Sequence, residues 1–248
     1  MLEHTFIHIK GIGRKTEQGL WERGIRTWRD FLETRKPVLS PARDRFIKSE
    51  LETSTRHLDD IRFFSDRLSS GDMWRLFKAF EEKAVYLDIE TSGGYQGMDE
   101  ITVIGLYDGK DVYTFVSGRN LDQFETAISD YDLVITFNGA TFDLPFIRRA
   151  FKNISLPAAH IDLRYVLKRL GYRGGLKKIE KVLGILRGPD IDGMDGYEAV
   201  RLWRAYTWGD NAALARLIQY NTADIVNLKP LMERGYAEMK GRLFSLGD

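Results

Sequence analysis

The sequence contains no cysteine. Disulfide bonds, thiolate metal sites and cysteine nucleophiles are therefore excluded, as is usual for proteins of a reducing compartment. The sequence also lacks a charge excess, because 37 lysines and arginines oppose 36 acidic residues, which excludes a histone-like chain. No stretch approaches the ~20 apolar residues of a membrane span, and the first residues lack the basic and apolar regions of a signal peptide. We expect a cytoplasmic protein without membrane contact.

The remaining composition is that of a folded protein with one or two domains. Of its 248 residues, 43% are hydrophobic and 29% are charged. Residues 1–80 carry 16 basic and 12 acidic residues, against 21 and 24 in the rest. Before residue 80 apolar residues recur at helical spacing, as in Leu58, Ile61, Phe64 and Leu68, whereas later ones form short β-branched or aromatic runs. We predict a mostly helical module over residues 1–80 and a second domain over residues 81–248.

The second domain is predicted to be α/β, with a mixed sheet flanked by helices. Strand-like runs cover residues 84–89, 101–107, 111–116 and 132–137. The second and third runs are split by Asp108-Gly109-Lys110, a hairpin-type turn, so the first three strands are predicted to form an antiparallel meander. Helical periodicity covers residues 120–130, 142–151, 163–170, 176–183 and 211–236. The predicted order is βββαβα followed by helices.

Acidic residues stand at the ends of these predicted strands and on the predicted helices. The first strand is apolar until Asp88 and Glu90, which the two-residue period places on one face, although both could simply face solvent. Asp143 follows another strand at a helix start, where it could equally be a capping residue. Tyr220 and Asp224 lie one helical turn apart, a spacing that also fits an aromatic residue beside a solvated acid. Each position alone has an ordinary explanation.

Together, the four acids and the tyrosine indicate a shared site at one edge of the sheet. Four carboxylates in one place would repel one another, and divalent cations are the natural neutraliser. Ligand sets made only of oxygen favour hard ions such as Mg²⁺ or Mn²⁺ over zinc. Two such ions roughly 3.5 to 4 Å apart can activate a water and stabilise the leaving oxygen of a phosphodiester. The pattern therefore predicts phosphodiester hydrolysis.

These segments resemble the three exonuclease motifs of the DEDD superfamily, which has the ribonuclease-H-like fold and includes proofreading exonucleases. The matching segments are Asp88-Ile89-Glu90-Thr91, Asn138-x-x-x-Phe142-Asp143 and Tyr220-x-x-x-Asp224. The tyrosine is typical of the DEDDy branch, since the sister branch has a histidine where this sequence has Gln219. The stretch from His160 through Gly175-Leu176-Lys177-Lys178 to Gly193 is similar to the YprB-type group. The resemblance covers residues 84–232, about two thirds of the chain.

The resemblance implies a role for each matching residue. It implies two Mg²⁺ or Mn²⁺ ions held by Asp88, Glu90, Asp143 and Asp224. It also implies that Tyr220 contacts the attacking water and that Thr91 and Asn138 bind substrate. A phenol has a pKa near 10, so Tyr220 is expected to orient the water rather than to act as a general base. Asp162 could lie near the site as an outer carboxylate or be an ordinary strand-end residue.

A basic segment is a candidate path for the nucleic acid. Residues 164–187 contain eight basic residues and one acid, Glu180. Lys177, Lys178 and Lys181 are predicted to point outward from a helix and to follow a phosphate backbone. The alternative is a solvated helix surface, since lysine is a common surface residue.

The N-terminal module contains a second candidate for phosphate binding. Residues 9–16 and the helix after them resemble the hairpin and second helix of a helix-hairpin-helix motif. Gly11 and Gly13 could present backbone N–H groups to a phosphate, or could form a plain turn. The resemblance is partial, because residues 5–9 read as extended and the first helix of the motif is shortened or absent.

The sequence thus predicts a ribonuclease-H-like α/β domain preceded by a smaller, mostly helical module. The predicted function is a metal-dependent 3′→5′ exonuclease acting on single-stranded DNA or RNA, with DNA slightly favoured and the direction taken from the resemblance. One alternative is a catalytically idle nucleic-acid-binding or adaptor protein on the same fold. Another is an RNA-trimming enzyme with the same chemistry, since no feature reports recognition of a 2′-hydroxyl. No particular protein partner is indicated.

Overall fold

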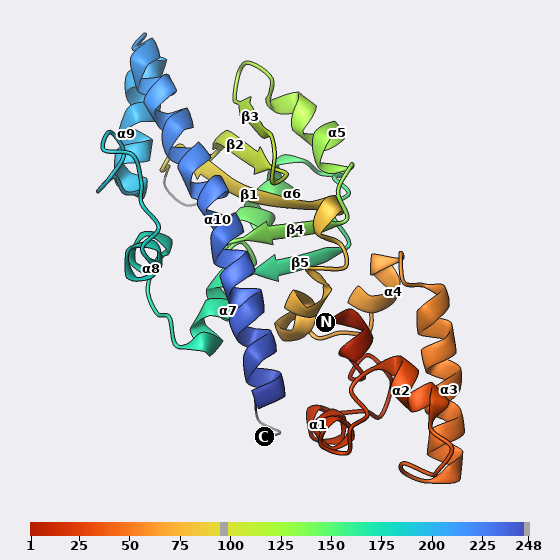
Figure 1. Ribbon diagram of the computed structural model, residues 1–248. Coiled ribbons are helices and arrows are strands. Elements are labelled where there is room, and N and C mark those ends of the chain that lie inside the picture. Colours follow the sequence, from red (N-terminus) through yellow and green to blue (C-terminus); the bar gives the residue numbers. More distant parts are fainter. Residues whose placement is uncertain (95–98, 246–248) are drawn as a thin grey trace. The chain divides into compact units, whose positions relative to one another are not determined.

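The computed structural model describes residues 1–94 and 99–245 (Figure 1). The chain forms two compact units. One unit consists of Met1–Glu81 together with the chain from Tyr236 onward, and the other of Glu82–Gly235. The last helix therefore contributes residues to both units, so no single position in the sequence separates them. Within the described residues, no helix combines the length and the apolarity that a membrane span requires.

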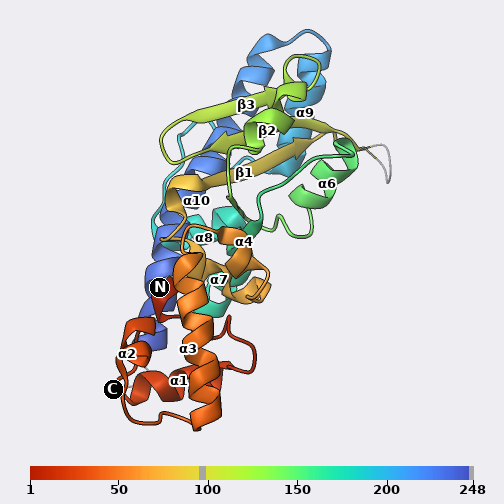
Figure 2. The same ribbon diagram turned by 90° about the vertical axis from the view of Figure 1, so that its right-hand side faces the viewer.

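The N-terminal unit is built from short helices, as the periodicity of residues 1–80 predicts (Figure 2). They are η1 (Leu2–His4), α1 (Arg14–Glu22), α2 (Trp28–Glu33), α3 (Pro41–Arg56), α4 (Ile61–Ser65) and η2 (Ser70–Leu76), where η denotes a 3₁₀ helix. Side-chain caps fix several helix starts: Thr27 and Asp30 form a capping box at α2, Ser40 caps α3 and Asp60 caps α4.

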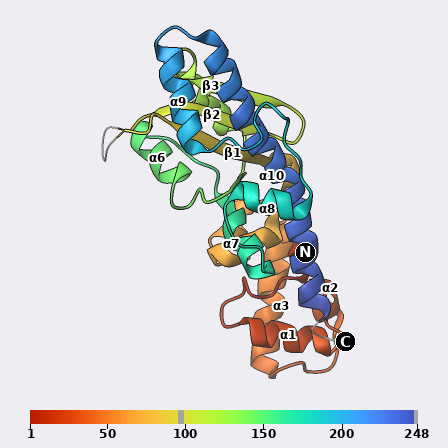
Figure 3. The same ribbon diagram turned by 90° about the vertical axis from the view of Figure 1, so that its left-hand side faces the viewer.

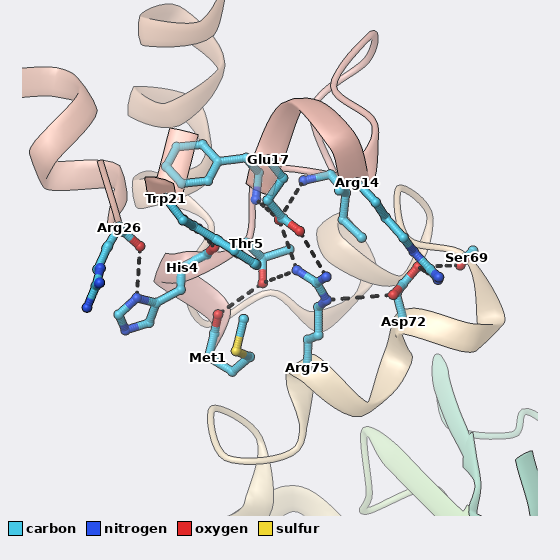
Figure 4. A network of polar contacts seen from close by, with 12 residues as sticks. Met1, His4, Thr5, Arg14, Glu17, Trp21, Arg26, Ser69, Asp72 and Arg75 are labelled. Carbon is cyan, nitrogen blue, oxygen red and sulfur yellow. Dashed lines mark hydrogen bonds and ion pairs between the residues drawn. The ribbon is translucent and has the colours of Figure 1, made fainter. Parts of the chain in front are cut away.

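A buried ion-pair network joins α1 to η2 within this unit (Figure 4). Both guanidinium ends of Arg75 donate to the carboxylate of Glu17, each at 2.9 Å, and both side chains are 1% exposed. The same Glu17 carboxylate accepts from the backbone N–H of Phe6 at 2.7 Å, while Asp72 lies 3.6 Å from Arg75 and 2.9 Å from Arg14. The charges balance one another, so removing one partner leaves the other buried and uncompensated.

Replacing Arg75 by alanine is therefore expected to lower the free energy of unfolding by about 3 kcal/mol, the lower end of the range for breaking a buried pair. Urea denaturation followed by circular dichroism measures this loss. The control is Arg29→Ala, which breaks the exposed Arg29–Glu33 pair and is expected to leave the unfolding midpoint unchanged. Equal midpoints for the Arg75 and Arg29 variants would contradict the structural importance of the buried network.

The second unit contains a mixed sheet with strand order β3-β2-β1-β4-β5 among the residues described. The strands are β1 (Ala84–Thr91), β2 (Ile101–Tyr107), β3 (Val112–Val116), β4 (Leu133–Thr136) and β5 (Ala159–Asp162). Strands β1, β2 and β3 pair antiparallel, while β4 pairs parallel with both β1 and β5. The predicted mixed sheet and its antiparallel meander are confirmed. Strand β5 was not among the predicted strands.

Helices cover both faces of this sheet. The helices of this part of the chain are η3 (Glu81–Lys83), η4 (Leu121–Gln123), α5 (Phe124–Ile128), α6 (Asp143–Ala150), α7 (Leu163–Leu170), α8 (Leu176–Leu183), α9 (Gly196–Thr207) and α10 (Asn211–Ser245). Figure 1 shows α10 passing in front of the sheet and α6 behind it. Leu87 and Ile89 pack with α5 and α6 on one side, while Val103 of β2 packs with α9 and α10 on the other. The alternate residues of β1, including Asp88 and Glu90, therefore face α10.

Candidate active site

Strand β1 delivers two carboxylates to the face of the sheet that α10 covers. Asp88 pairs with Gly105 and Glu90 with Val103 of the neighbouring strand β2. The parallel pairing of β1 with β4 covers only Ala84–Tyr86, so the acidic end of β1 extends beyond β4. The acids thus stand where two strands of the sheet diverge, an edge at which parallel-sheet proteins commonly place their sites.

Helix α10 brings the third carboxylate. Asp88, Glu90 and Asp224 each offer an oxygen within 4.8 Å of the oxygens of the other two. Glu90 and Asp224 are 8% and 6% exposed, and Tyr220, one turn before Asp224, is 4% exposed. The structure therefore gathers four of the five residues that the sequence singles out into one cluster, of which Asp88 is half-buried and the others are buried.

Asp143 lies beside these three acids rather than among them. It is the first residue of α6 and is 2% exposed. Its Oδ1 accepts a hydrogen bond of 3.1 Å from the backbone N–H of Ile89, which lies beyond the end of the β1–β4 pairing. Burial, and after it repulsion from the Asp143 carboxylate, raises the pKa of Asp88.

The cluster strongly disfavours full ionisation. Burial, followed by repulsion from neighbouring acids, raises the pKa of Asp88 and of Glu90 well above their usual values. Burial also raises the pKa of Asp143 to about 7 and that of Asp224 in the same direction. Burying these four carboxyl groups therefore disfavours their charged forms by more than the surrounding hydrogen bonds and cations compensate.

These shifts predict how stability depends on pH without divalent metal. The folded state keeps the Asp143 proton up to about pH 7, whereas an unfolded aspartate releases it near pH 3.9. Stability from this group is therefore complete below about pH 4 and is lost as pH rises through 7. The melting temperature in EDTA is expected to fall between pH 5 and 8, and less steeply in Asp143→Asn. Equal slopes for the two proteins would contradict the raised pKa.

Two cations partly compensate the acids. The Arg187 guanidinium lies 2.5 Å from Asp224 and donates to both oxygens of Glu180, each at 2.7 Å. Asn227 of α10 also donates to Glu180, at 2.9 Å. Glu180 therefore holds Arg187 against Asp224, and the Arg187 side chain is only 4% exposed. Neither Glu180 nor Arg187 was predicted to belong to the site.

Lys177 is the second cation, and its position corrects the sequence prediction. Its Nζ donates to the hydroxyl of Tyr220 at 2.6 Å and also contacts the Met194 carbonyl. Lys178 and Lys181 are exposed as predicted, but Lys177 shares the buried face of α8 with Glu180, three residues further on. Of the three lysines predicted to face outward, only Lys178 and Lys181 therefore do so.

Asn221 is a further site residue that the sequence prediction missed. It is 1% exposed, and its Nδ2 donates to the Asp88 carboxylate at 3.0 Å and to the Asp88 carbonyl at 3.3 Å. A Cβ on Gly105 of β2 would lie 2.1 Å from the Asn221 side-chain oxygen. Gly105 therefore leaves the space in which Asn221 reaches Asp88. The sequence contains one signal for Asn221. It is a polar residue directly after Tyr220, on a helix face that must pack on the sheet.

The loop from β4 to α6 is organised by Asp162. Its two carboxylate oxygens accept from the backbone N–H groups of Asn138 at 2.8 Å and Ala140 at 3.1 Å. Asn138 has a left-handed backbone with φ of 71°, and its side-chain oxygen accepts from Thr141 at 3.0 Å and from Arg164. Asp162 therefore fixes the backbone of the loop that leads to Asp143.

The other predicted substrate-binding residues lie in two places. Thr91, at the end of β1, donates to Asp99 at 3.2 Å. Gly11 and Gly13 belong to the N-terminal unit, where Gly11 has a φ of 84° and Gly13 is the N-cap of α1. One turn of 3₁₀ helix, η1, occupies the place of a first helix before this hairpin.

The residues of the cluster fit divalent cations. All its candidate ligands are carboxylate oxygens, the donors that Mg²⁺ and Mn²⁺ prefer. Glu90 Oε1 is buried and accepts no hydrogen bond from the described protein. A buried carboxylate oxygen without a donor carries a large desolvation cost, and a cation there would remove it.

Residues 85–236 match the family model of the RNase H superfamily. The chain belongs to this superfamily. The matched range includes all but the first residue of the described strands and all four acids, so the site described above lies within the RNase H domain. No curated protein matches the sequence.

Several solved structures are similar to part of this chain. A family B DNA polymerase from Pyrobaculum calidifontis is 16% identical, with 63% of this chain and 24% of that chain covered and a TM-score of 0.48. Escherichia coli RNase D, an exoribonuclease involved in structured RNA processing, is 18% identical, with coverages of 69% and 43% and a TM-score of 0.48. Brucella melitensis NrnC bound to pGG is 22% identical, with coverages of 69% and 80% and a TM-score of 0.44. The match thus spans less than half of the polymerase and of RNase D.

Proposed function

We propose that this protein is a metal-dependent 3′→5′ exonuclease of the DEDDy branch and the YprB-type group. It hydrolyses phosphodiester bonds of single-stranded nucleic acid, with DNA slightly favoured over RNA. The observation that carries the proposal is the cluster of Asp88, Glu90 and Asp224 beside Tyr220 in a domain of the RNase H superfamily. The direction of cleavage rests on the resemblance of the three motifs to those of DEDD exonucleases.

Asp88, Glu90 and Asp224 are proposed as ligands of two divalent ions, with Asp143 completing the set. Bound ions would lower the pKa of a water and stabilise charge on the leaving oxygen. The protein's own contribution is to hold the acids in place. Asn221 fixes Asp88, the backbone of Ile89 fixes Asp143, and β1 itself fixes the spacing of Asp88 and Glu90.

Tyr220 is proposed to orient the attacking water. Burial, and then the neighbouring acids, raise the pKa of its phenol, so it keeps its proton at neutral pH. Lys177 donates to the phenolic oxygen, which leaves the phenolic O–H to donate elsewhere. Tyr220 therefore acts as a hydrogen-bond donor whose direction Lys177 sets, and Lys177 is a positioning residue.

Thr91 and Asn138 are proposed to contact substrate, because they follow the acidic end of β1 and the end of β4. Lys178 and Lys181 form an exposed pair on α8 that could also meet a phosphate backbone. Phosphate binding by Gly11 and Gly13 is proposed separately for the N-terminal unit, since α1 begins without a side-chain cap.

A catalytically idle nucleic-acid-binding protein is the second candidate. One observation favours it: Arg187 lies 2.5 Å from Asp224 and so places a permanent cation against a proposed metal ligand. In an idle protein this ion pair would replace the metal. In an exonuclease, the metal ion must bind Asp224 alongside Arg187 or displace Arg187 from Asp224.

The deciding experiment incubates 5′-labelled and 3′-labelled single-stranded DNA and RNA with Mg²⁺, Mn²⁺ or EDTA. Ladders of 5′-labelled products that shorten stepwise and require metal are expected from the exonuclease. Binding without cleavage under every condition would favour the idle protein. Comparison of the DNA and RNA ladders decides the sugar preference.

A further inference from the structure

A groove of about 700 Å³ lies between the end of β4, helix α7 and the link from α7 to α8. Arg164, Lys168 and Arg173 line it, together with Tyr165 and Tyr172. None of its lining residues is acidic. Figure 3 shows α7 and α8 as neighbouring elements of the same unit. Asn138, in the loop after β4, is also one of the groove's lining residues.

We propose that this groove binds the unpaired nucleotides next to the scissile bond, with phosphates on Arg164, Lys168 and Arg173 and a base stacked on Tyr165. This inference rests on the proposed exonuclease function and adds to it a binding site for the single strand. It also moves the substrate path from the outer face of α8, which the sequence predicted, to α7.

The charge of the groove matches a phosphate backbone. Arg164 and Lys168 lie one turn apart on α7 and so point to the same side. Arg173 approaches from the link that follows the helix. Three cations without an acid among the lining residues give a local positive charge in a chain whose net charge is only +1. Such a local excess attracts phosphates and makes binding depend on salt.

The aromatic residues of the groove favour nucleic acid over a simple anion. Tyr165 is 45% exposed, although it follows a buried leucine at the start of α7. A large aromatic side chain left open beside three cations is suited to stacking on an unpaired base. Paired bases are already stacked on one another, so this contact selects single strands or frayed ends.

The groove is continuous with the site through shared residues. Asn138 lines the groove, and its loop leads directly to Asp143. Gly175 also lines it and is the N-cap of α8, whose Lys177 contacts Tyr220. No side chain caps the start of α8, so its first N–H groups can donate to a phosphate that leaves the groove toward the acids.

The test measures binding of a 5′-fluorescein-labelled ten-nucleotide oligo(dT) to the full chain in EDTA, by anisotropy at several salt concentrations. Lys168→Glu/Arg173→Glu is expected to weaken binding about tenfold to a hundredfold and to lower the salt slope by about two. Tyr165→Ala is expected to weaken binding about tenfold with the slope unchanged. An unlabelled blunt duplex is expected to compete poorly.

The matched control reverses two exposed lysines elsewhere in the domain, Lys110→Glu/Lys152→Glu. Lys110 lies in the β2–β3 turn, at the opposite end of β1 from the acids, and Lys152 follows α6. This control is expected to bind like wild type. Melting curves for all variants confirm that each is folded.

Three results would overturn the inference. Wild-type affinity in both groove variants would remove the groove from the substrate path, and a loss confined to Lys178→Glu/Lys181→Glu would move the strand to α8. Equal competition by duplex would remove the requirement for unpaired bases. Cleavage by wild type with normal binding in the groove variants would leave the exonuclease proposal intact, whereas a wild type that neither binds nor cleaves would end both.

Discussion

Asp88→Asn is expected to lower the rate of single-strand cleavage by at least about a thousandfold, which corresponds to more than about 4 kcal/mol of transition-state stabilisation. Asparagine keeps the size of the side chain but removes a charge that a divalent ion needs. Asp88 shares a 4.8 Å cluster with Glu90 and Asp224, so a loss there disturbs any ion that the cluster holds. Single-turnover kinetics with Mg²⁺ and calorimetric titration of Mg²⁺ measure both consequences.

The matched control for this prediction is Asp132→Asn. Asp132 is an exposed acid just before the start of β4, whereas the acidic end of β1 lies beyond the end of β4. It is expected to cleave at the wild-type rate. Asp88→Asn is also expected to fold, because it relieves repulsion among acids whose pKa values are already raised. A folded Asp88→Asn protein that retains more than a tenth of the wild-type rate would contradict the proposed role.

The second large effect is expected from the pair Lys177 and Tyr220. Tyr220→Phe is expected to slow cleavage by roughly tenfold to a thousandfold, because the water loses the group that orients it. Lys177→Met should approach the same loss, since it removes the donor that fixes the phenol at 2.6 Å. The double variant is expected to be no slower than Tyr220→Phe alone, because both changes remove one interaction.

Rates of the four proteins, measured at saturating and at limiting substrate, decide between positioning and binding. A positioning role lowers kcat, whereas a role in binding raises KM. Lys152→Met is the control, since Lys152 is exposed, follows α6 and has no proposed role in binding or cleavage. Losses that multiply in the double variant would show that Lys177 acts independently of Tyr220.

The sequence was sufficient to predict the strands and turns whose residue pattern is strong. The runs predicted at residues 84–89 and 101–107 are long and apolar, and they form β1, which extends to Thr91, and β2. The turn predicted between the second and third strands is also present. Strand β5 has only four residues, Ala159–Asp162, and a run so short carries too little periodicity to distinguish it from a loop. Helix α9 was not predicted either, although Asp195 caps its start.

The cluster of acids was foreseeable, but its supporting contacts were not. Strand period and helix spacing place Asp88, Glu90 and Asp224 on definite faces, and these faces meet in the structure. Lys177 points inward because it shares a helix face with the buried Glu180. The burial of Glu180 depends on its ion pair with Arg187, seven residues further along the chain. Asn221 depends on the absence of a side chain at Gly105, more than a hundred residues earlier. Such contacts are set by tertiary packing, which local patterns do not report.

The N-terminal unit combines an early and a late segment of the chain, and this affects the order in which the chain can fold during synthesis. Tyr236 packs its ring against Trp74 and Phe77, at centroid distances of 5.9 and 5.7 Å, and Phe244 packs against His4 and Trp21. The aromatic core formed by residues of the first 80 positions is therefore complete only after Tyr236 and Phe244 have been synthesised. The unit that carries the acids ends at Gly235, so all its residues are synthesised before that aromatic core can close.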